Sequence, residues 1–181
     1  MATYREQAWE IAVGRHGYVT TREAVQRGIP GIELVKMAAR GKIRHLAHGI
    51  YRFDELPTSD LAPYYEAVLR VGDDSFLLGD AVLALHGLAN VNPKRIRVAS
   101  KKRVRRNLPE WIRLESATVT PREVEVFESI RTTTVTRALL DARPYVMQER
   151  LLEATSEAYD RGLIAKRDVM RLEYELLEPV E

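Results

Sequence analysis

The sequence contains no cysteine among its 181 residues, so it has neither a disulfide framework nor a thiolate metal site. It also lacks any apolar run approaching the ~18 residues that a membrane-spanning helix needs. Its first residues, Met-Ala-Thr-Tyr-Arg-Glu, are polar and unlike the start of a signal peptide. We therefore expect a cytoplasmic protein with no membrane partner.

Catalytic motifs are missing as well. The sequence has no glycine-rich dinucleotide fingerprint and no Walker loop. Among the scattered histidines, His45 and His48 are three residues apart on a predicted hairpin, which is poor geometry for zinc. The strand–carboxylate–lysine pattern of metal-dependent nucleases is also missing, because the predicted strand 95–100 has no acid and neither Glu115 nor Glu125 has a lysine two residues later. We predict that the protein is not an enzyme and has no catalytic residues, cofactor or metal.

Net charge is only +2, but its distribution along the chain is uneven. Residues 1–55 carry nine Lys or Arg and six Asp or Glu, residues 94–106 carry eight basic residues and no acid, and residues 151–181 carry four basic and eight acidic residues. Such asymmetry indicates a basic surface for an anionic partner. For the acidic end, a solvated surface over two packed helices is the preferred interpretation, and docking of a basic partner protein is the alternative.

The first 55 residues follow the pattern of a winged helix-turn-helix. The second helix begins with a threonine cap answered by Glu23 and ends at Gly28, a residue that favours the left-handed conformation. The third helix has Pro30 in its first turn and is terminated by Gly41. Gly49 lies where a hairpin turn needs a positive φ. The predicted elements are a helix over residues 4–15, a helix capped by Thr20 or Thr21, a helix from Pro30 to Arg40, and strands over 42–46 and 49–53.

The third helix has the two faces that a recognition helix needs. The spacing of Leu34 and Met37 predicts a core-facing side, whereas Glu33, Lys36 and Arg40 fall on another, polar side. We expect this helix to enter the major groove of duplex DNA, with Lys36 and Arg40 on the groove side. Glu33 would accept a hydrogen bond from a cytosine amine or repel phosphate from a wrong register.

The other predicted DNA contacts come from the start of the second helix and from the hairpin. A helix N-terminus suits phosphate, and the hairpin would touch the backbone or the minor groove. The residues assigned to these contacts are Thr20, Thr21, Arg22, Arg44, His45 and His48. A winged helix that serves only protein interaction is the alternative.

A polar segment with a central proline, residues 54–60, separates this module from the second half. We predict a DNA-binding domain over residues 1–55 and an α+β domain over residues 63–181. In the second domain, a small mixed or antiparallel sheet would pack with helices. The expected helices are 63–71, 80–87, 136–142, 146–161 and 166–177, and the expected strands are 95–100, 112–117, 124–127 and 130–134.

Three polar residues of the second half have expected local roles. Asp80 is the expected N-cap of the helix that Gly87 closes, and Thr136 is the expected N-cap of a later helix. His86 lies in an apolar helix, where a hydrogen-bonded core histidine is a better interpretation than a metal ligand.

The strongest electrostatic feature is the acid-free run from Lys94 to Arg106. Each phosphate that such a surface neutralises would add about one unit to the log–log salt slope of binding. We expect a surface for DNA or for a partner protein, and a solvated loop between two strands is the alternative. The residues assigned to this surface are Lys94, Arg95, Lys101, Lys102, Arg103, Arg105 and Arg106.

Three segments resemble the AbiEi antitoxin family, the DNA-binding halves of type IV toxin–antitoxin pairs. The first is the helix-turn-helix with its hairpin, where Gly28-Ile29, Arg40-Gly41-Lys42-Ile43 and His48-Gly49-Ile50-Tyr51 are similar to family stretches. The second is Ala84-Leu85-His86-Gly87-Leu88, and the third is Thr133-Thr134-Val135-Thr136-Arg137-Ala138-Leu139-Leu140-Asp141. Ala38 and Ala39 are small where relatives often carry bulkier or basic residues, so the groove-facing surface is expected to differ.

The resemblance implies a protein that represses its own operon by binding inverted repeats and that counteracts a toxin resembling nucleotidyltransferases. It also implies a division of tasks, with repression by the N-terminal module and neutralisation by the C-terminal domain. We expect a monomer or a DNA-induced dimer. The alternatives are a protein-interaction module and a transcriptional regulator without a toxin partner.

Overall fold

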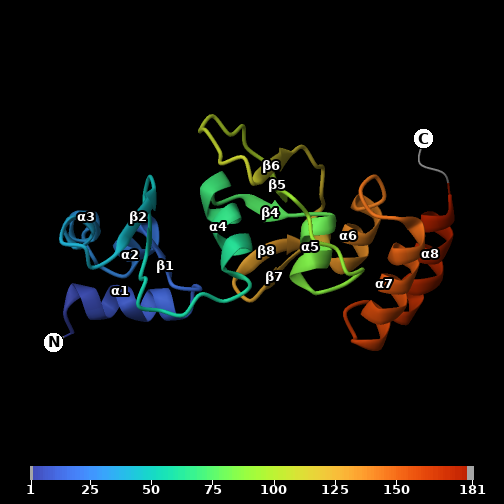
Figure 1. Ribbon diagram of the computed structural model, residues 1–181, viewed down its shortest axis with the longest axis horizontal. Helices are drawn as coiled ribbons and strands as arrows, with labels where there is room; N and C mark the ends of the chain where they lie inside the picture. The colour runs from blue at the N-terminus through green and yellow to red at the C-terminus, as the bar shows by residue number, and fades with distance from the viewer. Residues whose placement is uncertain (1, 179–181) are drawn as a thin grey trace. The chain divides into compact units, whose positions relative to one another are not determined.

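The structure is a computed structural model that describes residues 2–178 (Figure 1). Contacts divide the chain into two units, with the boundary between Arg70 and Val71. Each unit contains both helices and strands, which confirms the predicted α+β class. No helix in the described residues is long and apolar enough to cross a membrane.

The first unit consists of α1 (Tyr4–Val13), β1 (Tyr18–Thr20), α2 (Thr21–Gln26), α3 (Gly31–Ala39), β2 (Arg44–Ala47), β3 (Ile50–Arg52) and α4 (Ala62–Val71), whose last residue lies beyond the boundary. Its strands pair antiparallel in the order β1-β3-β2. Helices α2 and α3 with the β2–β3 hairpin form the predicted winged helix-turn-helix. Strand β1 was not predicted, because its three residues become a strand only by pairing with β3.

Local signals fix the ends of these helices. Gly14 is the C-cap of α1, so that helix ends earlier than predicted. Thr20 caps α2: its hydroxyl accepts the N–H of Glu23 at 3.1 Å, and the Glu23 carboxylate accepts the N–H of Thr20 at 3.2 Å. Gly28 follows α2 with a φ of +80°, a conformation that glycine adopts without steric cost. Pro30 is the N-cap of α3 rather than its first residue.

Helix α4 belongs to the first unit, although we predicted it at the start of the second domain. The Tyr18 hydroxyl donates to Glu66 at 2.8 Å, and the Arg70 guanidinium donates to the carbonyl of Leu46 at 3.2 Å. Tyr65 is buried, and its ring contacts that of Tyr18. These partners are far apart in the sequence, so no local pattern marked them. The separate tasks of the two domains stay a prediction.

The segment after β3 is held by one buried cation. Arg52 is buried, and its guanidinium donates to Asp54 at 2.9 Å and to the Thr58 hydroxyl at 2.7 Å. The same guanidinium lies over the ring of Tyr18, 5.8 Å from its centroid. The predicted linker 54–60 is therefore pinned to the sheet of the first unit.

The second unit consists of β4 (Ser75–Leu77), α5 (Asp80–Leu85), β5 (Ile96–Ser100), β6 (Ile112–Glu115), the 3-10 helix η1 (Pro121–Glu123), β7 (Val124–Phe127), β8 (Ile130–Thr133), α6 (Val135–Asp141), α7 (Gln148–Asp160) and α8 (Lys166–Leu177). The sheet has the order β6-β5-β4-β8-β7 (Figure 1). The pairs β5–β6 and β4–β8 are parallel, while β4–β5 and β7–β8 are antiparallel. The predicted mixed sheet is thus present, with β4 as an additional, central strand that we did not predict.

Two predicted caps are wrong. Gly79, not Asp80, is the N-cap of α5, because Asp80 is buried and its carboxylate accepts a hydrogen bond from Arg97 instead. Thr134, not Thr136, caps α6, and its hydroxyl accepts the backbone N–H three residues later at 3.4 Å. In both helices the actual cap lies before the predicted one, so each helix begins earlier along the chain.

Segments 84–88 and 133–141, which carry the resemblance in the second half, pack together through α5 and α6. Their buried apolar side chains include Leu85, Leu88, Val135, Ala138 and Leu139. At Gly79, where φ is +57°, a Cβ would lie 3.4 Å from the carbonyl oxygen of Asp141. Glycine therefore permits the close approach of the two helices. Both family-like segments contribute buried side chains to the core of the second unit.

His86 is buried as predicted, but the expected hydrogen bond is missing at one nitrogen. Its ring packs on that of Phe127, with 4.3 Å between centroids. Its Nε2 atom has no hydrogen-bond partner among the described residues. Burial lowers the pKa of His86, so the neutral ring is favoured in the folded protein.

Candidate nucleic-acid interface

Helix α3 turns Leu34 and Met37 into the core and leaves its opposite side exposed. Lys36 lies on the exposed side and pairs with Glu33 at 2.8 Å. The carboxylate that was expected to meet a base is thus held by the neighbouring lysine. Arg40 is the C-cap residue and is exposed, so both predicted cations of α3 are accessible.

The exposed side of α3 is not wholly polar. Ile32 and Val35 are 56% and 48% exposed, and Ala39 is also exposed. At about 100° per residue these three positions form one half of the outward face, beside Lys36 and Arg40. We did not predict these exposed aliphatic residues, although their spacing places them outside the Leu34–Met37 stripe.

The start of α2 is occupied by contacts within the fold. The Thr20 hydroxyl donates to the Glu23 carboxylate at 2.8 Å, and the backbone N–H of Thr21 donates to the carbonyl of Gly49 at 2.9 Å. Arg22 is exposed. The structure therefore brings the helix start and the hairpin turn together, while contact of these residues with phosphate stays a prediction.

All three predicted hairpin contacts, Arg44, His45 and His48, are exposed. Arg44 pairs with Asp54 at 2.8 Å, and the His45 ring lies against that of Tyr51 with 5.0 Å between centroids. His48 lies in the turn between β2 and β3. Within residues 2–178 no three His, Asp or Glu side chains are grouped so as to hold a metal ion.

The helix-turn-helix and hairpin carry unbalanced positive charge. Residues 20–53 contain seven Lys or Arg but only two acids, Glu23 and Glu33. Both acids are already paired, with Arg15 at 3.0 Å and with Lys36 at 2.8 Å. Three exposed cations of this segment form no ion pair or side-chain hydrogen bond with the described residues: Arg27, Arg40 and Lys42. Unpaired cations on an exposed module suit the phosphate backbone of a nucleic acid.

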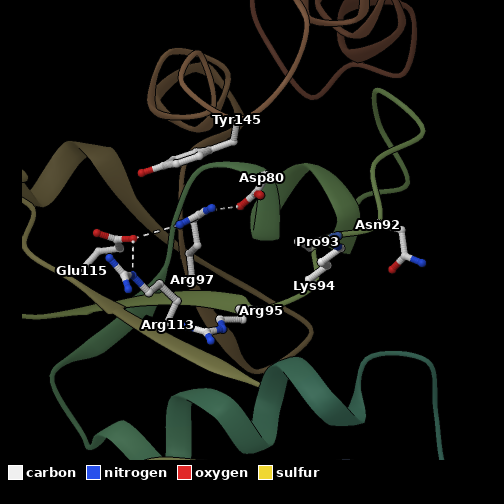
Figure 2. A pocket seen from close by; sticks show the side chains of 9 residues that line it. All are labelled: Asp80, Asn92, Pro93, Lys94, Arg95, Arg97, Arg113, Glu115 and Tyr145. Carbon is white, nitrogen blue, oxygen red and sulfur yellow. Dashed lines mark hydrogen bonds and ion pairs between the residues drawn. The ribbon is translucent and has the colours of Figure 1, made fainter. Parts of the chain in front are cut away.

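The basic run of the second unit is split by Arg97, which turns inward from β5. Its guanidinium donates to Asp80 and to Glu115, each at 2.9 Å (Figure 2). The Tyr145 ring covers it, with 3.4 Å between the guanidinium carbon and the ring centroid. Burial raises the pKa of the Asp80 carboxyl, although Arg97 opposes the rise. Arg97 thus ties α5 to β6 and to the segment before α7.

A hollow of about 530 Å³ lies beside this network (Figure 2). Lys94 and Arg95 line it and form no ion pair with the described residues, and Arg113 lines it with one contact, to Glu115 at 3.3 Å. The acids in the lining are both paired with the inward-turned arginine. The hollow is therefore net positive and suits an anionic group such as phosphate.

The rest of the run, residues 101–106, lies in the loop after β5. Lys102 pairs with Asp74 at 2.5 Å, and its hydrogen bond lowers the pKa of that carboxyl. Lys101 is exposed. Lys102, Arg103, Arg105 and Arg106 line a second hollow, of about 550 Å³. The predicted basic surface is thus divided: the cations before β5 line the first hollow, and all those after β5 except Lys101 line the second.

A comparison with protein families finds a match within the first unit. Residues 9–53 match the family of transcriptional regulators described as AbiEi antitoxin, which confirms the predicted resemblance over the helix-turn-helix and its hairpin. No curated protein matches the chain. The chain is also similar to the crystal structure of the RV2827C protein from Mycobacterium tuberculosis, with a TM-score of 0.53 and 15% identity over 95% of this chain and 71% of that one. At this identity the similarity concerns the fold alone.

Proposed function

We propose that this protein is the antitoxin of a type IV toxin–antitoxin system and a DNA-binding repressor of its own operon. The observation that carries the proposal is the match of residues 9–53 to AbiEi transcriptional regulators, over a segment whose helix α3 is exposed. In this proposal the first unit binds an operator with inverted repeats. The second unit counteracts a nucleotidyltransferase-like toxin.

The exposed cations of the first unit support binding to duplex DNA. Lys36 and Arg40 would face the bases from α3, and Glu33 would orient Lys36 through their ion pair. The start of α2 and the hairpin would hold the phosphate backbone on either side. Their residues are Thr20, Thr21, Arg22, Arg44, His45 and His48. Two chains on inverted repeats would form a dimer induced by DNA.

The second unit offers two surfaces for the toxin. One is the cationic hollow lined by Lys94 and Arg95. The other is α8, where Met170, Tyr174 and Leu177 are exposed at helical spacing. Both surfaces lie in the second unit and α3 lies in the first, so the proposal assigns neutralisation and repression to different units.

DNA binding is tested by fluorescence anisotropy with a labelled duplex from the chain's own upstream region, at about 50 and 200 mM salt. Lys36→Ala should cost about 1–3 kcal/mol of discrimination between operator and unrelated duplex. Arg27→Ala with Lys42→Ala, which removes two exposed cations of the first unit, should weaken binding to all sequences and flatten the salt slope. Identical behaviour of the two variants would contradict the assigned roles. Absence of binding at both salt concentrations would favour a protein-interaction module.

Neutralisation is tested by co-expression with the product of a neighbouring nucleotidyltransferase-like gene. The full chain should restore growth. Lys36→Ala with Arg40→Ala should lose repression yet still restore growth, because these side chains are exposed on α3 and the second unit is unchanged. Failure of the full chain to restore growth, with repression intact, would leave a transcriptional regulator without a toxin partner.

A further inference from the structure

We propose that α3 recognises thymine methyl groups of the operator through an apolar half-face formed by Ile32, Val35 and Ala39. This inference rests on the proposed function, because it requires that the first unit binds duplex DNA. It adds the chemical group that is recognised and the side chains that recognise it, neither of which follows from the cations of α3.

The side chains of Ile32, Val35 and Ala39 are exposed and do not contribute to the core. The core of the first unit takes Leu34 and Met37 from α3, while Ile32 and Val35 remain 56% and 48% exposed. Ala39 continues the same side of the helix one turn later. Two large aliphatic side chains and a small one therefore form a continuous apolar strip along a short helix.

The charges around this apolar strip favour DNA over a protein as its partner. Lys36 and Arg40 border it on the same helix, and Arg27 and Lys42 are exposed without ion pairs in the described residues. A protein surface that matched the strip would have to be apolar and rimmed by acids, whereas the major groove offers apolar methyl groups between two rows of phosphates. The groove is also about as wide as one α-helix with its side chains.

The base edges of the major groove offer one group that fits an apolar side chain. In the major groove only thymine presents a methyl group, and apolar side chains are its usual partners. The small Ala39 allows the helix to lie close to the bases, and α3 is well anchored for this task. A Cβ at Gly31, its first residue, would lie 2.9 Å from the Thr21 methyl carbon, so the start of α3 packs directly on α2. The strip therefore lies on a helix whose first residue packs closely against α2.

The experiment replaces thymine by deoxyuridine, which keeps the base pair and removes only the methyl group. The duplexes cover the operator as located by footprinting of the upstream region. At every thymine position of one half-site they carry either thymine or deoxyuridine. Fluorescence anisotropy gives the affinity of the whole protein for each duplex. Wild type should lose about four-fold in affinity for each methyl group it contacts, which corresponds to about 0.8 kcal/mol. Val35→Ala should bind the thymine duplex several-fold more weakly than wild type, yet lose little more on the deoxyuridine duplex.

Val13→Ala is the matched control, because Val13 is a 59% exposed valine at the end of α1 in the same unit. It should respond to deoxyuridine as wild type does. Thermal unfolding of all variants checks that each is folded. Equal affinity of wild type for both duplexes would overturn methyl recognition while leaving DNA binding, and so the proposed function, intact.

Two other outcomes would also overturn the inference. Absence of binding to either duplex would remove the proposed function and methyl recognition together. Sedimentation in the absence of DNA gives the third outcome: a wild-type dimer that Val35→Ala dissociates, with Val13→Ala unchanged, would assign the strip to a second copy of this chain.

Discussion

Arg97 shows how much one side chain in a basic run can differ from its neighbours. It is 18% exposed, with two carboxylates and an aromatic ring as partners, whereas Arg95, two positions earlier, is exposed and forms no ion pair with the described residues. A cation in the first setting holds the fold, and one in the second is available to an anionic partner. Their charges are equal, so it is burial and the local partners that decide whether each arginine stabilises the fold or is available for binding.

Replacement of each arginine by glutamine should separate these roles. Arg97→Gln leaves the buried Asp80 without a cation and leaves Glu115 paired with Arg113 alone, and should lower the free energy of unfolding by about 3 kcal/mol. Arg95→Gln should change it by no more than about 0.5 kcal/mol. Urea unfolding at pH 7 measures both. Equal effects of the two substitutions on the free energy of unfolding would show that the Arg97 network does not stabilise the fold more than an exposed arginine does.

At the scale of the element, one carboxylate joins η1 to α6. Glu123 accepts the N–H of Thr120 at 2.8 Å and pairs with Arg137, also at 2.8 Å. The backbone and side-chain hydrogen bonds of Thr120 and the hydrogen bond from Arg137 lower the pKa of Glu123 from 4.5 to about 2. Arg137 also pairs with Asp141 at 2.9 Å, so the third family-like segment is fastened to the edge of the sheet.

This lowered pKa predicts a pH dependence of stability. The charged form is favoured in the folded state, so the gain is complete above pH 4.5 and is lost as pH falls towards 2. Because the side chain is about one-third exposed, we expect Glu123→Gln to cost only about 1 kcal/mol at neutral pH, and nothing near pH 2. Urea unfolding at both pH values measures this difference.

Glu110→Gln is the control for that experiment. Glu110 is exposed and forms no ion pair or hydrogen bond with the described residues, so its substitution should have little effect at either pH. A Glu123→Gln variant that is destabilised equally at neutral pH and near pH 2 would show that packing, and not the charge, is responsible.

At the scale of the whole molecule, the chain divides within α4, after Arg70. The contacts that place this helix in the first unit are polar and aromatic: Tyr18 with Glu66, Arg70 with the carbonyl of Leu46, and the buried ring of Tyr65. The three-stranded sheet of the first unit therefore has α4 as a part of its packing.

Truncation tests this division. A fragment that ends at Val71 should fold cooperatively, whereas one that ends at Asp60 should be less stable by about 3 kcal/mol or more. The reason is that it loses two hydrogen bonds that involve a charged group, Tyr18 to Glu66 and Arg70 to Leu46, each worth about 1.5–3 kcal/mol, and the burial of Tyr65. Circular dichroism during thermal unfolding compares the two fragments. Equal stability would mean that α4 is dispensable to the first unit.

Sequence patterns were reliable where the cause is local. Helix α8 and strand β7 have the predicted bounds, and Gly28 has the expected positive φ. The cap of α2 was predicted as Thr20 or Thr21 answered by Glu23, and the structure selects Thr20. In each case the signal is the residue itself or its spacing to neighbours within a few positions. The winged helix-turn-helix and its family resemblance followed from such signals, and residues 9–53 match the AbiEi regulators.

Only the tertiary structure decided which residues these elements bring together. Strands β1 and β4 have three residues each and exist because of their partners. Asp80 has a salt bridge to Arg97 instead of a cap, and α4 joins the first unit. The spacing of α3 places Ile32 and Val35 outside the Leu34–Met37 stripe, but how far each side chain is exposed depends on the elements packed around the helix. Pairing, burial and helix rotation are set by contacts between distant segments, and a sequence pattern of a few residues does not contain them.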